Sequence, residues 1–343
     1  MLFKKFFFST LGGTVIAGIV GVFMALNDFG VWALVSQYVI NAAIDTTILW
    51  LTVKWRPELK FSFERLKGLF NFGWKLLVSS LLDTTYINIR QLIIGKIYSP
   101  ADLAQYNRGR QFPDLIVKNI NNSIDSVLLP ALSNEQDSIE NVRMMTRQAI
   151  KVSTYIMAPL MMGLVCTGKP LISLVLTDKW LPCLLYMRIF CITFMFYPIH
   201  TANLNAINAL GRSDLFLKLE IWKKVVGTIA LLCTMWISVD AMAYSMLATS
   251  IASQIINSAP NKKLLNYGYK QQLKDILPGI ALAVFMGICI YPISYLGLSN
   301  LLKLCIQVLL GMIIYIGGSM LFKMDSFAYL WSIINPFIKG KRG

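Results

Sequence analysis

Charged and amide side chains interrupt an apolar stretch at residues 81–100, which reads LLDTTYINIRQLIIGKIYSP. Asp83, Asn88 and Arg90 lie in its middle. Charge is costly at the depth of a lipid bilayer, and ionisable residues there usually mark a substrate or ion pathway. The stretch therefore predicts a polar functional lining inside a membrane-embedded helix.

A helix over 72–96 is predicted to be amphipathic along its length. Asp83 and Arg90 share one face of this helix two turns apart, and Asn88 and Gln91 belong to a neighbouring polar strip. The opposite face carries leucine and isoleucine residues that suit lipid or a packed neighbour. This pattern is typical of a helix that lines a cavity.

The next apolar segment, 107–130, repeats the pattern. Arg110, Asp114 and Lys118 recur every four residues and form one stripe on a helix. Pro113 lies within this stripe and frees a backbone carbonyl group. A freed carbonyl at membrane depth must be covered by protein or water. Two consecutive helices with polar stripes predict a hydrated or polar-lined cavity between them.

An alternative is that the charges in these stripes neutralise one another. Arg110 and Asp114, and likewise Asp114 and Lys118, have the i,i+4 spacing of a helical ion pair. Both interpretations remain open at the level of sequence.

The composition is that of a membrane protein. Of the 343 residues, 56% are hydrophobic and 14% are charged, whereas soluble globular chains carry about 25% charged residues. The six cysteines are dispersed and form no CxxC pair, which is typical of buried apolar residues. His200 is the single histidine, which argues against imidazole-based metal chemistry. We expect neither a metal nor a cofactor.

Apolar runs of about 20 residues, the length that crosses a bilayer, recur along the chain. About ten candidate spans result, namely 8–26, 30–53, 72–96, 107–130, 149–167, 181–205, 217–237, 241–261, 276–296 and 300–322. The connections between them alternate between segments poor in basic residues and segments rich in them. The sequence therefore predicts an all-α, polytopic integral membrane protein.

The basic residues are distributed unevenly between the two sides of these spans. One set of connections, together with both chain ends, holds 22 of the 32 lysine and arginine residues, and the opposite set holds five. Because cytoplasmic loops are enriched in basic residues, both termini are predicted to be cytoplasmic. This asymmetry accounts for the net charge of +15 without a nucleic-acid partner.

The first two spans are predicted to form a helical hairpin rather than a cleaved signal peptide. The run LGGTVIAGIVGVFMAL continues into a second span without a small-residue cleavage site. The connections that follow are short and contain no cluster of carboxylates or histidine. We therefore do not expect an enzyme.

Four separated blocks of the sequence resemble one known family. They are KWRPELKFSFERLKGLFNFGWKLLVSSLLDTTYINIRQLIIGKIYSPADLAQYNRGRQF, VLLPALSNEQ, KPLISLVLTDKWLP and NALGRSDLFLKLEI. The chain is similar over most of its length to bacterial polysaccharide exporters, the flippases of lipid-linked oligosaccharides, particularly the colanic-acid, capsule and O-antigen type. Their superfamily also contains multidrug antiporters.

The resemblance implies a two-lobed transporter fold of six plus six helices with extra C-terminal helices. Residues 1–53 would be the last two helices of the N-terminal lobe, and 54–71 a cytoplasmic amphipathic linker. Residues 72–261 would be the C-terminal six-helix lobe, and 262–343 two additional helices and a basic tail. The chain begins at the family's fifth helix, so the first four helices are expected to be absent from it.

The resemblance also implies a function: flipping undecaprenyl-diphosphate-linked oligosaccharides across the inner membrane by alternating access, for cell-surface polysaccharide biosynthesis. Membrane lipids and the polysaccharide polymerase machinery are the expected partners. Cationic side chains would bind the diphosphate, and the candidates are Arg90, Arg110, Lys118, Arg108 and Arg188. Candidates for sugar contacts, charge balance or ion coupling are Asp83, Asn88, Gln91, Tyr106 and Asp114.

Two other functions remain as alternatives. A cation-coupled multidrug antiporter of the same superfamily would use cavity carboxylates, whereas the stripes here are rich in cations. A polytopic membrane enzyme of polysaccharide assembly would present a long periplasmic loop with clustered arginine or histidine residues, and the sequence shows none.

Overall fold

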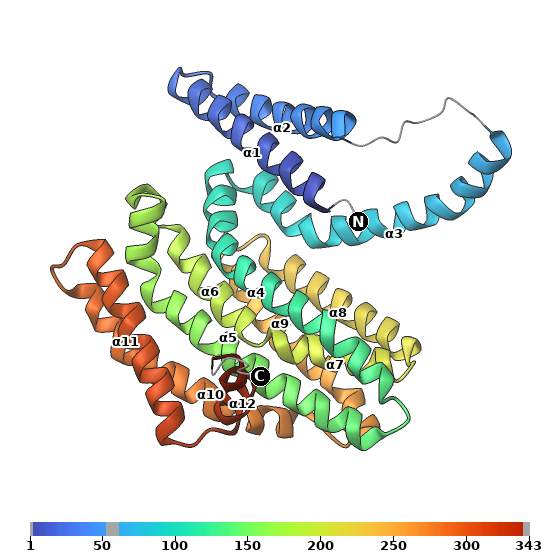
Figure 1. The fold of residues 1–343 in the computed structure, drawn as a ribbon, viewed down its shortest axis with the longest axis vertical. Coiled ribbons are helices and arrows are strands. Elements are labelled where there is room, and N and C mark those ends of the chain that lie inside the picture. Colours follow the sequence, from blue (N-terminus) through green and yellow to red (C-terminus); the bar gives the residue numbers. More distant parts are fainter. Residues whose placement is uncertain (1–2, 53–61, 339–343) are drawn as a thin grey trace. The chain divides into compact units, whose positions relative to one another are not determined.

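The computed structural model describes residues 3–52 and 62–338 and is helical almost throughout them (Figure 1). The α-helices are α1 Phe3–Leu26, α2 Val31–Thr52, α3 Phe63–Ile97, α4 Pro100–Asn134, α5 Ile139–Val175, α6 Cys183–Met195, α7 Tyr197–Ala209, α8 Ser213–Thr234, α9 Val239–Leu264, α10 Tyr269–Ile290, α11 Asn300–Leu321 and α12 Asp325–Ile338. Two short 3₁₀ helices, η1 Asp178–Trp180 and η2 Tyr291–Tyr295, follow α5 and α10. The described residues contain no β-strand. The predicted all-α fold is confirmed.

The chain forms two compact units, residues 1–79 and 80–343. In the first unit, α1 and α2 pack against each other as the predicted hairpin. Gly13 explains the close approach: a Cβ atom there would lie 2.6 Å from the side-chain oxygen of Asn41 on α2. Small residues allow such contacts between membrane helices.

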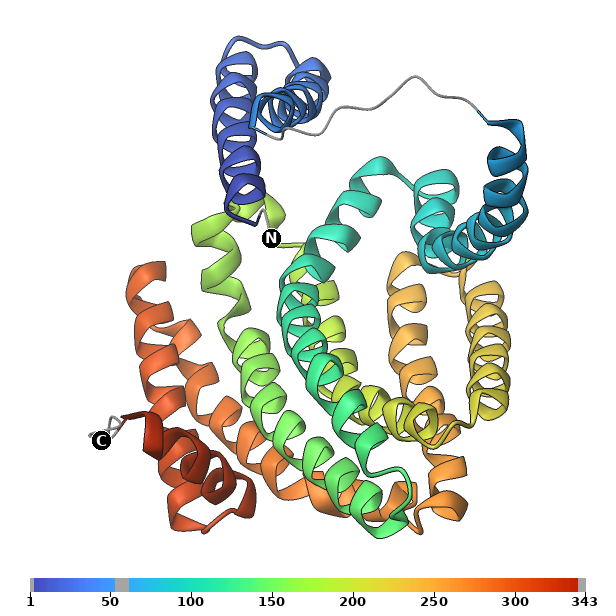
Figure 2. The same cartoon turned by 45° about the vertical axis from the view of Figure 1, so that its right-hand side comes forward.

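In the second unit, α5 is the central helix and packs against α4, α6, α7, α10, α11 and α12 (Figures 1 and 2). The α8 and α9 helices form an antiparallel pair, and α9 also contacts α6, α7 and α10. The last helices of the chain are therefore continuous with the preceding bundle.

Serine residues are the N-caps of three long helices, α4, α5 and α9. Ser99 accepts a hydrogen bond from the backbone of Asp102, whose carboxylate accepts one from the Ser99 backbone, and Pro100 occupies the first turn. This is a capping box, which satisfies amide groups left free at a helix start. Ser138 and Ser238 cap α5 and α9 in the simpler form.

The ten predicted spans coincide with α1 to α5, with the α6–α7 pair, and with α8 to α11. The helix breaks next to Pro198, because α6 ends at Met195 and α7 begins at Tyr197. Among the described residues, five helical segments are long and apolar enough to cross a membrane by length and composition alone: α2, α5, α6–α7, α10–η2 and α11. Together they confirm a polytopic membrane fold.

Two segments differ from the sequence prediction or go beyond it. Residues 325–338, included in a basic tail above, form α12. Within the predicted linker 54–71, residues 54–61 lie outside the described part, and α3 runs without interruption from Phe63 to Ile97. The domain boundaries inferred from the family resemblance stay predictions.

The interior of the second unit is apolar with a buried amide cluster. The side-chain amide of Asn203 on α7 donates to the side-chain oxygen of Gln272 at 2.9 Å. The side-chain amides of Asn261 and Gln272 both donate to the side-chain oxygen of Asn203, at 2.6 and 2.9 Å. All three side chains are fully buried. Hydrogen bonding offsets the cost of burying them, and the cluster ties α7, α9 and α10 together.

Candidate functional site

The Arg90 guanidinium joins α3 to α9. Its Nη1 group donates to the Met242 carbonyl and, at 2.9 Å, to the Ser245 hydroxyl. Arg90 is half-buried, and the hydrogen-bond partners that the structure describes for its five donors are neutral groups of α9. Asp83, two turns earlier on α3, has a side chain outside the described part of the structure.

Arg90 is close to a second guanidinium, on α4. Arg90, Tyr106 and Arg110 lie within range of electrostatic interaction with one another. Like charges repel at such range, and the repulsion is stronger in a medium of low polarity. The pair of guanidinium groups therefore favours an anion between or beside them.

Arg110 is neutralised within its own helix. The Nε group of Arg110 lies 3.1 Å from the Asp114 carboxylate, and Lys118 lies 3.9 Å from the same oxygen. The predicted alternative of i,i+4 neutralisation thus holds for this stripe. Lys118 remains 72% exposed, whereas Arg110 and Asp114 are only 23% and 22% exposed.

Tyr106 lies in the aromatic core beneath Arg110. Its ring packs edge-on against Tyr186 and Phe190 at centroid distances of 5.6 and 5.2 Å, and its hydroxyl donates to the Met246 sulfur. The side chain has no exposed surface. In this conformation Tyr106 packs in the core next to the site. Its predicted contact with a sugar stays a prediction.

Arg108 and Arg188 contact other parts of the second unit. Arg108 stacks over the Trp180 ring at 5.0 Å, beside the connection that follows α5. Arg188 donates to the Val165 carbonyl at 3.3 Å and lies over the Tyr291 ring at 5.7 Å. Neither is brought to the Arg90–Arg110 pair by a contact in the structure.

The remaining candidates lie on α3. Asn88 donates to the Thr84 carbonyl of its own helix, and Gln91 is half-buried. The backbone of Asp83 is helical, but its side chain lies outside the described part of the structure.

The structure adds polar residues of α8 that the sequence analysis had assigned to the cytoplasmic side. Lys223, only 11% exposed, pairs with Glu220 and lies 3.4 Å from the Nε2 atom of His200. The other ring nitrogen of His200, Nδ1, lies 2.8 Å from the side-chain amide nitrogen of Asn257 on α9. Glu220 and Lys223 have i,i+3 spacing inside the predicted span 217–237. This spacing is the feature of the sequence that could have predicted their ion pair.

Lys224 extends the polar region to α3. Its ammonium lies 5.7 Å from the ring centre of Tyr86, and the Tyr86 hydroxyl donates to the Lys224 carbonyl at 3.3 Å. Beside His200, a pocket of about 160 Å³ is lined by Tyr197, Met246 and Gln254 among others. Ammonium, guanidinium and amide groups from α3, α4, α7, α8 and α9 thus form one polar region in the bundle.

Comparisons with known proteins agree with this architecture. A family profile described as "Polysaccharide biosynthesis protein" matches residues 1–185. Teichuronic acid biosynthesis protein TuaB of Bacillus subtilis is 24% identical, over 92% of this chain and 68% of TuaB. Lipopolysaccharide biosynthesis protein WzxC of Escherichia coli is 23% identical, over 54% of this chain and 38% of WzxC.

A third relative, succinoglycan biosynthesis transport protein ExoT of Rhizobium meliloti, is 21% identical over 48% of this chain and 33% of ExoT. The matched region thus spans about a third of ExoT and two thirds of TuaB. Among solved structures, the lipid II flippase MurJ in an inward closed conformation matches 91% of this chain and 67% of its own, with a TM-score of 0.70 and 15% identity. That likeness shows the fold.

The profile covers more than half of the chain, and the relatives are named for transport or biosynthesis of surface polysaccharides. The helical bundle around Arg90 and Arg110 has the fold of a flippase. The chain is therefore a multi-pass membrane protein that belongs to the polysaccharide biosynthesis protein family.

Proposed function

We propose that the protein flips lipid-linked oligosaccharides across the inner membrane, with undecaprenyl diphosphate as the lipid carrier, for cell-surface polysaccharide biosynthesis. The named functions of TuaB, WzxC and ExoT support this class of substrate. Alternating access of the bundle is the mechanism, and both termini lie in the cytoplasm.

One observation carries the proposal: the Arg90 guanidinium is half-buried, and the partners described for it, the Met242 carbonyl and the Ser245 hydroxyl, are neutral. An uncompensated charge in a protein interior is strongly destabilising. A phosphate ligand removes that cost, because guanidinium and phosphate groups form short, paired, charge-assisted hydrogen bonds. Arg110, on the neighbouring helix, supplies a second cation for a diphosphate.

The other polar residues have distinct roles in the proposal. Asp114 balances Arg110 when the substrate is absent, because it already accepts from that guanidinium. Asn88 and Gln91, two positions and one position from Arg90 in α3, offer amide groups to sugar hydroxyls. A polar lining of this kind shields a charged, hydroxyl-rich head group from hydrocarbon while the polyprenyl tail stays in the lipid.

A multidrug antiporter is less consistent with the geometry. A cationic substrate needs an unpaired carboxylate, but Asp114 already interacts with Arg110 and Lys118. Among the side chains that the structure describes, the half-buried charge with neutral partners is the Arg90 cation. An anionic substrate is therefore favoured.

Export in cells tests the proposal. The full-length protein and its variants are expressed in a strain whose own exporter of this class is deleted, and surface polysaccharide is measured with a specific antibody. We expect Arg90→Gln to lower the signal at least tenfold and Arg90→Lys to lower it less. Lys303→Gln, a basic residue at the start of α11, is the control and should export normally. Equal export by the Arg90→Gln variant and the control, at matched membrane levels, contradicts the proposal.

A further inference from the structure

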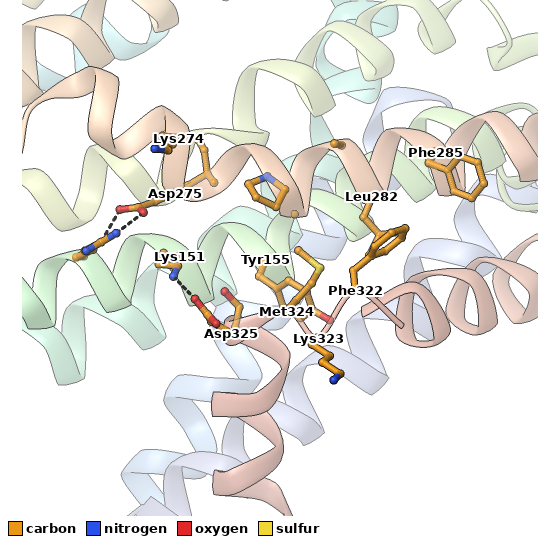
Figure 3. A pocket seen from close by; sticks show the side chains of 16 residues that line it. Lys151, Tyr155, Lys274, Asp275, Leu282, Phe285, Phe322, Lys323, Met324 and Asp325 are labelled. Carbon is orange, nitrogen blue, oxygen red and sulfur yellow. Dashed lines mark hydrogen bonds and ion pairs between the residues drawn. The ribbon is translucent and has the colours of Figure 1, made fainter. Parts of the chain in front are cut away.

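A pocket of about 720 Å³ lies between α5, α10 and the connection from α11 to α12 (Figure 3). Its lining divides into two parts. Lys151, Lys274, Asp275 and Asp325 gather at one end, whereas Leu282, Phe285 and Phe322 lie at the other (Figure 3). None of α3, α4, α6 or α7 contributes to it. The pocket is therefore separate from the Arg90–Arg110 region.

The pocket lining as a whole carries an excess of positive charge. Four basic residues line the pocket, Arg147, Lys151, Lys274 and Lys323, against two carboxylates, Asp275 and Asp325. Lys151 pairs with Asp325 at 3.0 Å. Among the described residues, Lys274 and Lys323 have no carboxylate within ion-pair distance. This end of the pocket is complementary to an anion.

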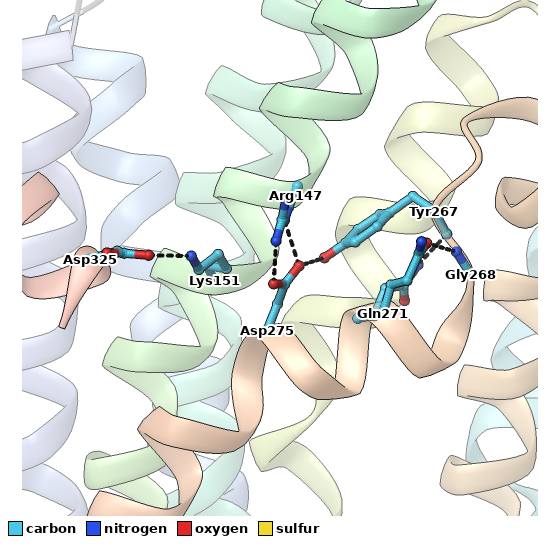
Figure 4. Close-up of polar contacts among 8 residues, drawn as sticks. Arg147, Lys151, Tyr267, Gly268, Gln271, Asp275 and Asp325 are labelled. Carbon is cyan, nitrogen blue, oxygen red and sulfur yellow. Dashed lines mark hydrogen bonds and ion pairs between the residues drawn. The ribbon is translucent and has the colours of Figure 1, made fainter.

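Arg147 is held in place so that one edge of its guanidinium stays available. Its Nε and Nη2 groups donate to the two oxygens of Asp275, both at 2.7 Å (Figure 4). The Tyr267 hydroxyl donates to the same carboxylate at 2.9 Å. Asp275 is 9% exposed but Arg147 is 51% exposed. Because the guanidinium has five N–H donors, its Nη1 edge can bind a second oxyanion.

The other end of the pocket is suited to hydrocarbon. Phe285 and Phe322 line it and are 57% and 71% exposed. Beyond Asp325, α12 exposes the aromatic residues Tyr329 and Trp331, a residue type that concentrates at membrane interfaces. An apolar lining beside a basic one matches a ligand with a charged head and a hydrocarbon tail.

We propose that this pocket binds the phosphate headgroup of an anionic glycerophospholipid, with Arg147, Lys151, Lys274 and Lys323 around the phosphate and an acyl chain along Leu282, Phe285 and Phe322. The lipid is a resident of the membrane and not the transported substrate, because the proposed substrate cations lie on α3 and α4. A free phosphate ion would leave the apolar end unfilled. The distinction from the transported substrate rests on the proposed function, whereas the lipid-binding pocket itself does not.

Native mass spectrometry of the purified full-length protein tests the site. Phosphatidylglycerol, phosphatidylethanolamine and undecaprenyl phosphate are titrated separately, and the bound lipid is counted. The pocket variant is Lys274→Gln with Lys323→Gln. The control is Lys270→Gln with Lys263→Gln, which removes the same charge from exposed positions on α10 and α9 outside the pocket. Thermal unfolding confirms that both variants are folded.

A lysine near an anionic lipid contributes about 1 kcal/mol, or roughly fivefold in affinity. We expect the pocket variant to bind phosphatidylglycerol about 25-fold more weakly and the control to change less than twofold. Phosphatidylethanolamine should bind more weakly than phosphatidylglycerol to the unaltered protein.

A further variant, Phe322→Ala, tests the apolar end separately. It should weaken binding of long-chain phosphatidylglycerol and leave a dihexanoyl analogue unaffected. Equal losses in the pocket and control variants, or no loss in either, would overturn the proposal. Preferential binding of undecaprenyl phosphate that the pocket variant abolishes would also overturn it, because the pocket would then hold the carrier lipid.

Discussion

The side chains of Arg147 and Asp275, 128 residues apart in sequence, form a bidentate ion pair in which both nitrogen–oxygen distances are 2.7 Å. The pair joins α5, the central helix of the bundle, to α10, the first helix after α9. The Tyr267 hydroxyl donates to the same carboxylate, and the buried Asn203–Gln272–Asn261 cluster ties α10 to α7 and α9. The last helices of the chain are thus anchored by polar contacts as well as by apolar packing.

Breaking this ion pair should destabilise the bundle. We expect Asp275→Asn to lower the free energy of unfolding by about 1–2 kcal/mol, because Arg147 loses its charged acceptor and Tyr267 a strong one. A double-mutant cycle with Arg147→Gln should show coupling of about 1 kcal/mol. The matched control is Arg212–Asp214, a bidentate pair that is exposed on both sides and should show no measurable coupling. Equal coupling in the two cycles would contradict a structural role for Arg147–Asp275.

Asn203 should be among the least tolerant positions of the interior. Asn203→Ala removes the shared partner of Gln272 and Asn261, leaving buried amide groups unsatisfied. Each such group costs about 1–3 kcal/mol, so we expect a large loss of thermal stability in detergent. Asn119→Ala, whose side chain is exposed and bonds only within α4, is the control and should unfold almost as the parent does.

Two glycines in long helices should respond to alanine in opposite ways. A Cβ atom at Gly109 would lie 2.6 Å from the Cys183 carbonyl and 2.9 Å from the Met187 amide, both backbone atoms of α6. We expect Gly109→Ala to destabilise the protein, because α4 and α6 must separate. At Gly163 the Cβ atom has nothing within 4 Å, so Gly163→Ala should stabilise α5 by about 0.5–1 kcal/mol. Thermal unfolding of both variants checks the contrast, and a shift in the same direction for both would refute it.

The stability of the protein should fall at alkaline pH because of Tyr267, which lies between α9 and α10. Burial raises the pKa of Tyr267 above its ordinary value of 10.0, and its hydrogen bond to the Asp275 carboxylate raises the pKa further. The unfolded chain releases this proton near pH 10 while the folded chain retains it. The stability that the protonated phenol contributes is therefore complete below pH 10 and declines above it, by up to about 1.4 kcal/mol per pH unit.

Thermal unfolding between pH 8 and 11 measures this dependence. The parent protein should lose stability above pH 10 more steeply than Tyr267→Phe, and the two curves should run parallel below pH 9. Parallel curves over the whole range would show that Tyr267 titrates normally in the folded protein.

The helices and the break at Pro198 could be predicted from the sequence because each depends on local signals. Apolar runs of bilayer length, serine caps and proline positions act within a few residues of the chain. The ion pairs of Arg110, Asp114 and Lys118 also depend on neighbours within one helix, and their i,i+4 spacing predicts them. Prediction was therefore most successful where the determining residues are neighbours along one helix.

Other features depend on contacts between distant segments and could not be predicted in this way. A charge count places Lys223 on one side of the membrane but does not reveal that its side chain is only 11% exposed and lies beside His200. Its burial depends on α7 and on Asn257 of α9, which a window along α8 does not contain. In the same way, the separation of Arg188 from Arg90 depends on which face of α6 meets α5, and the pocket beside Arg147 depends on where α12 lies.

The most direct test of the central claim is binding of undecaprenyl diphosphate to the purified full-length protein and its Arg90→Gln variant. A charge-assisted hydrogen bond contributes about 1.5–3 kcal/mol, so we expect the variant to bind at least tenfold more weakly. Ser245→Ala removes one neutral partner of Arg90 without removing the charge, and it should retain most of the affinity. Unchanged binding in folded Arg90→Gln protein would contradict the assignment of this guanidinium to the diphosphate.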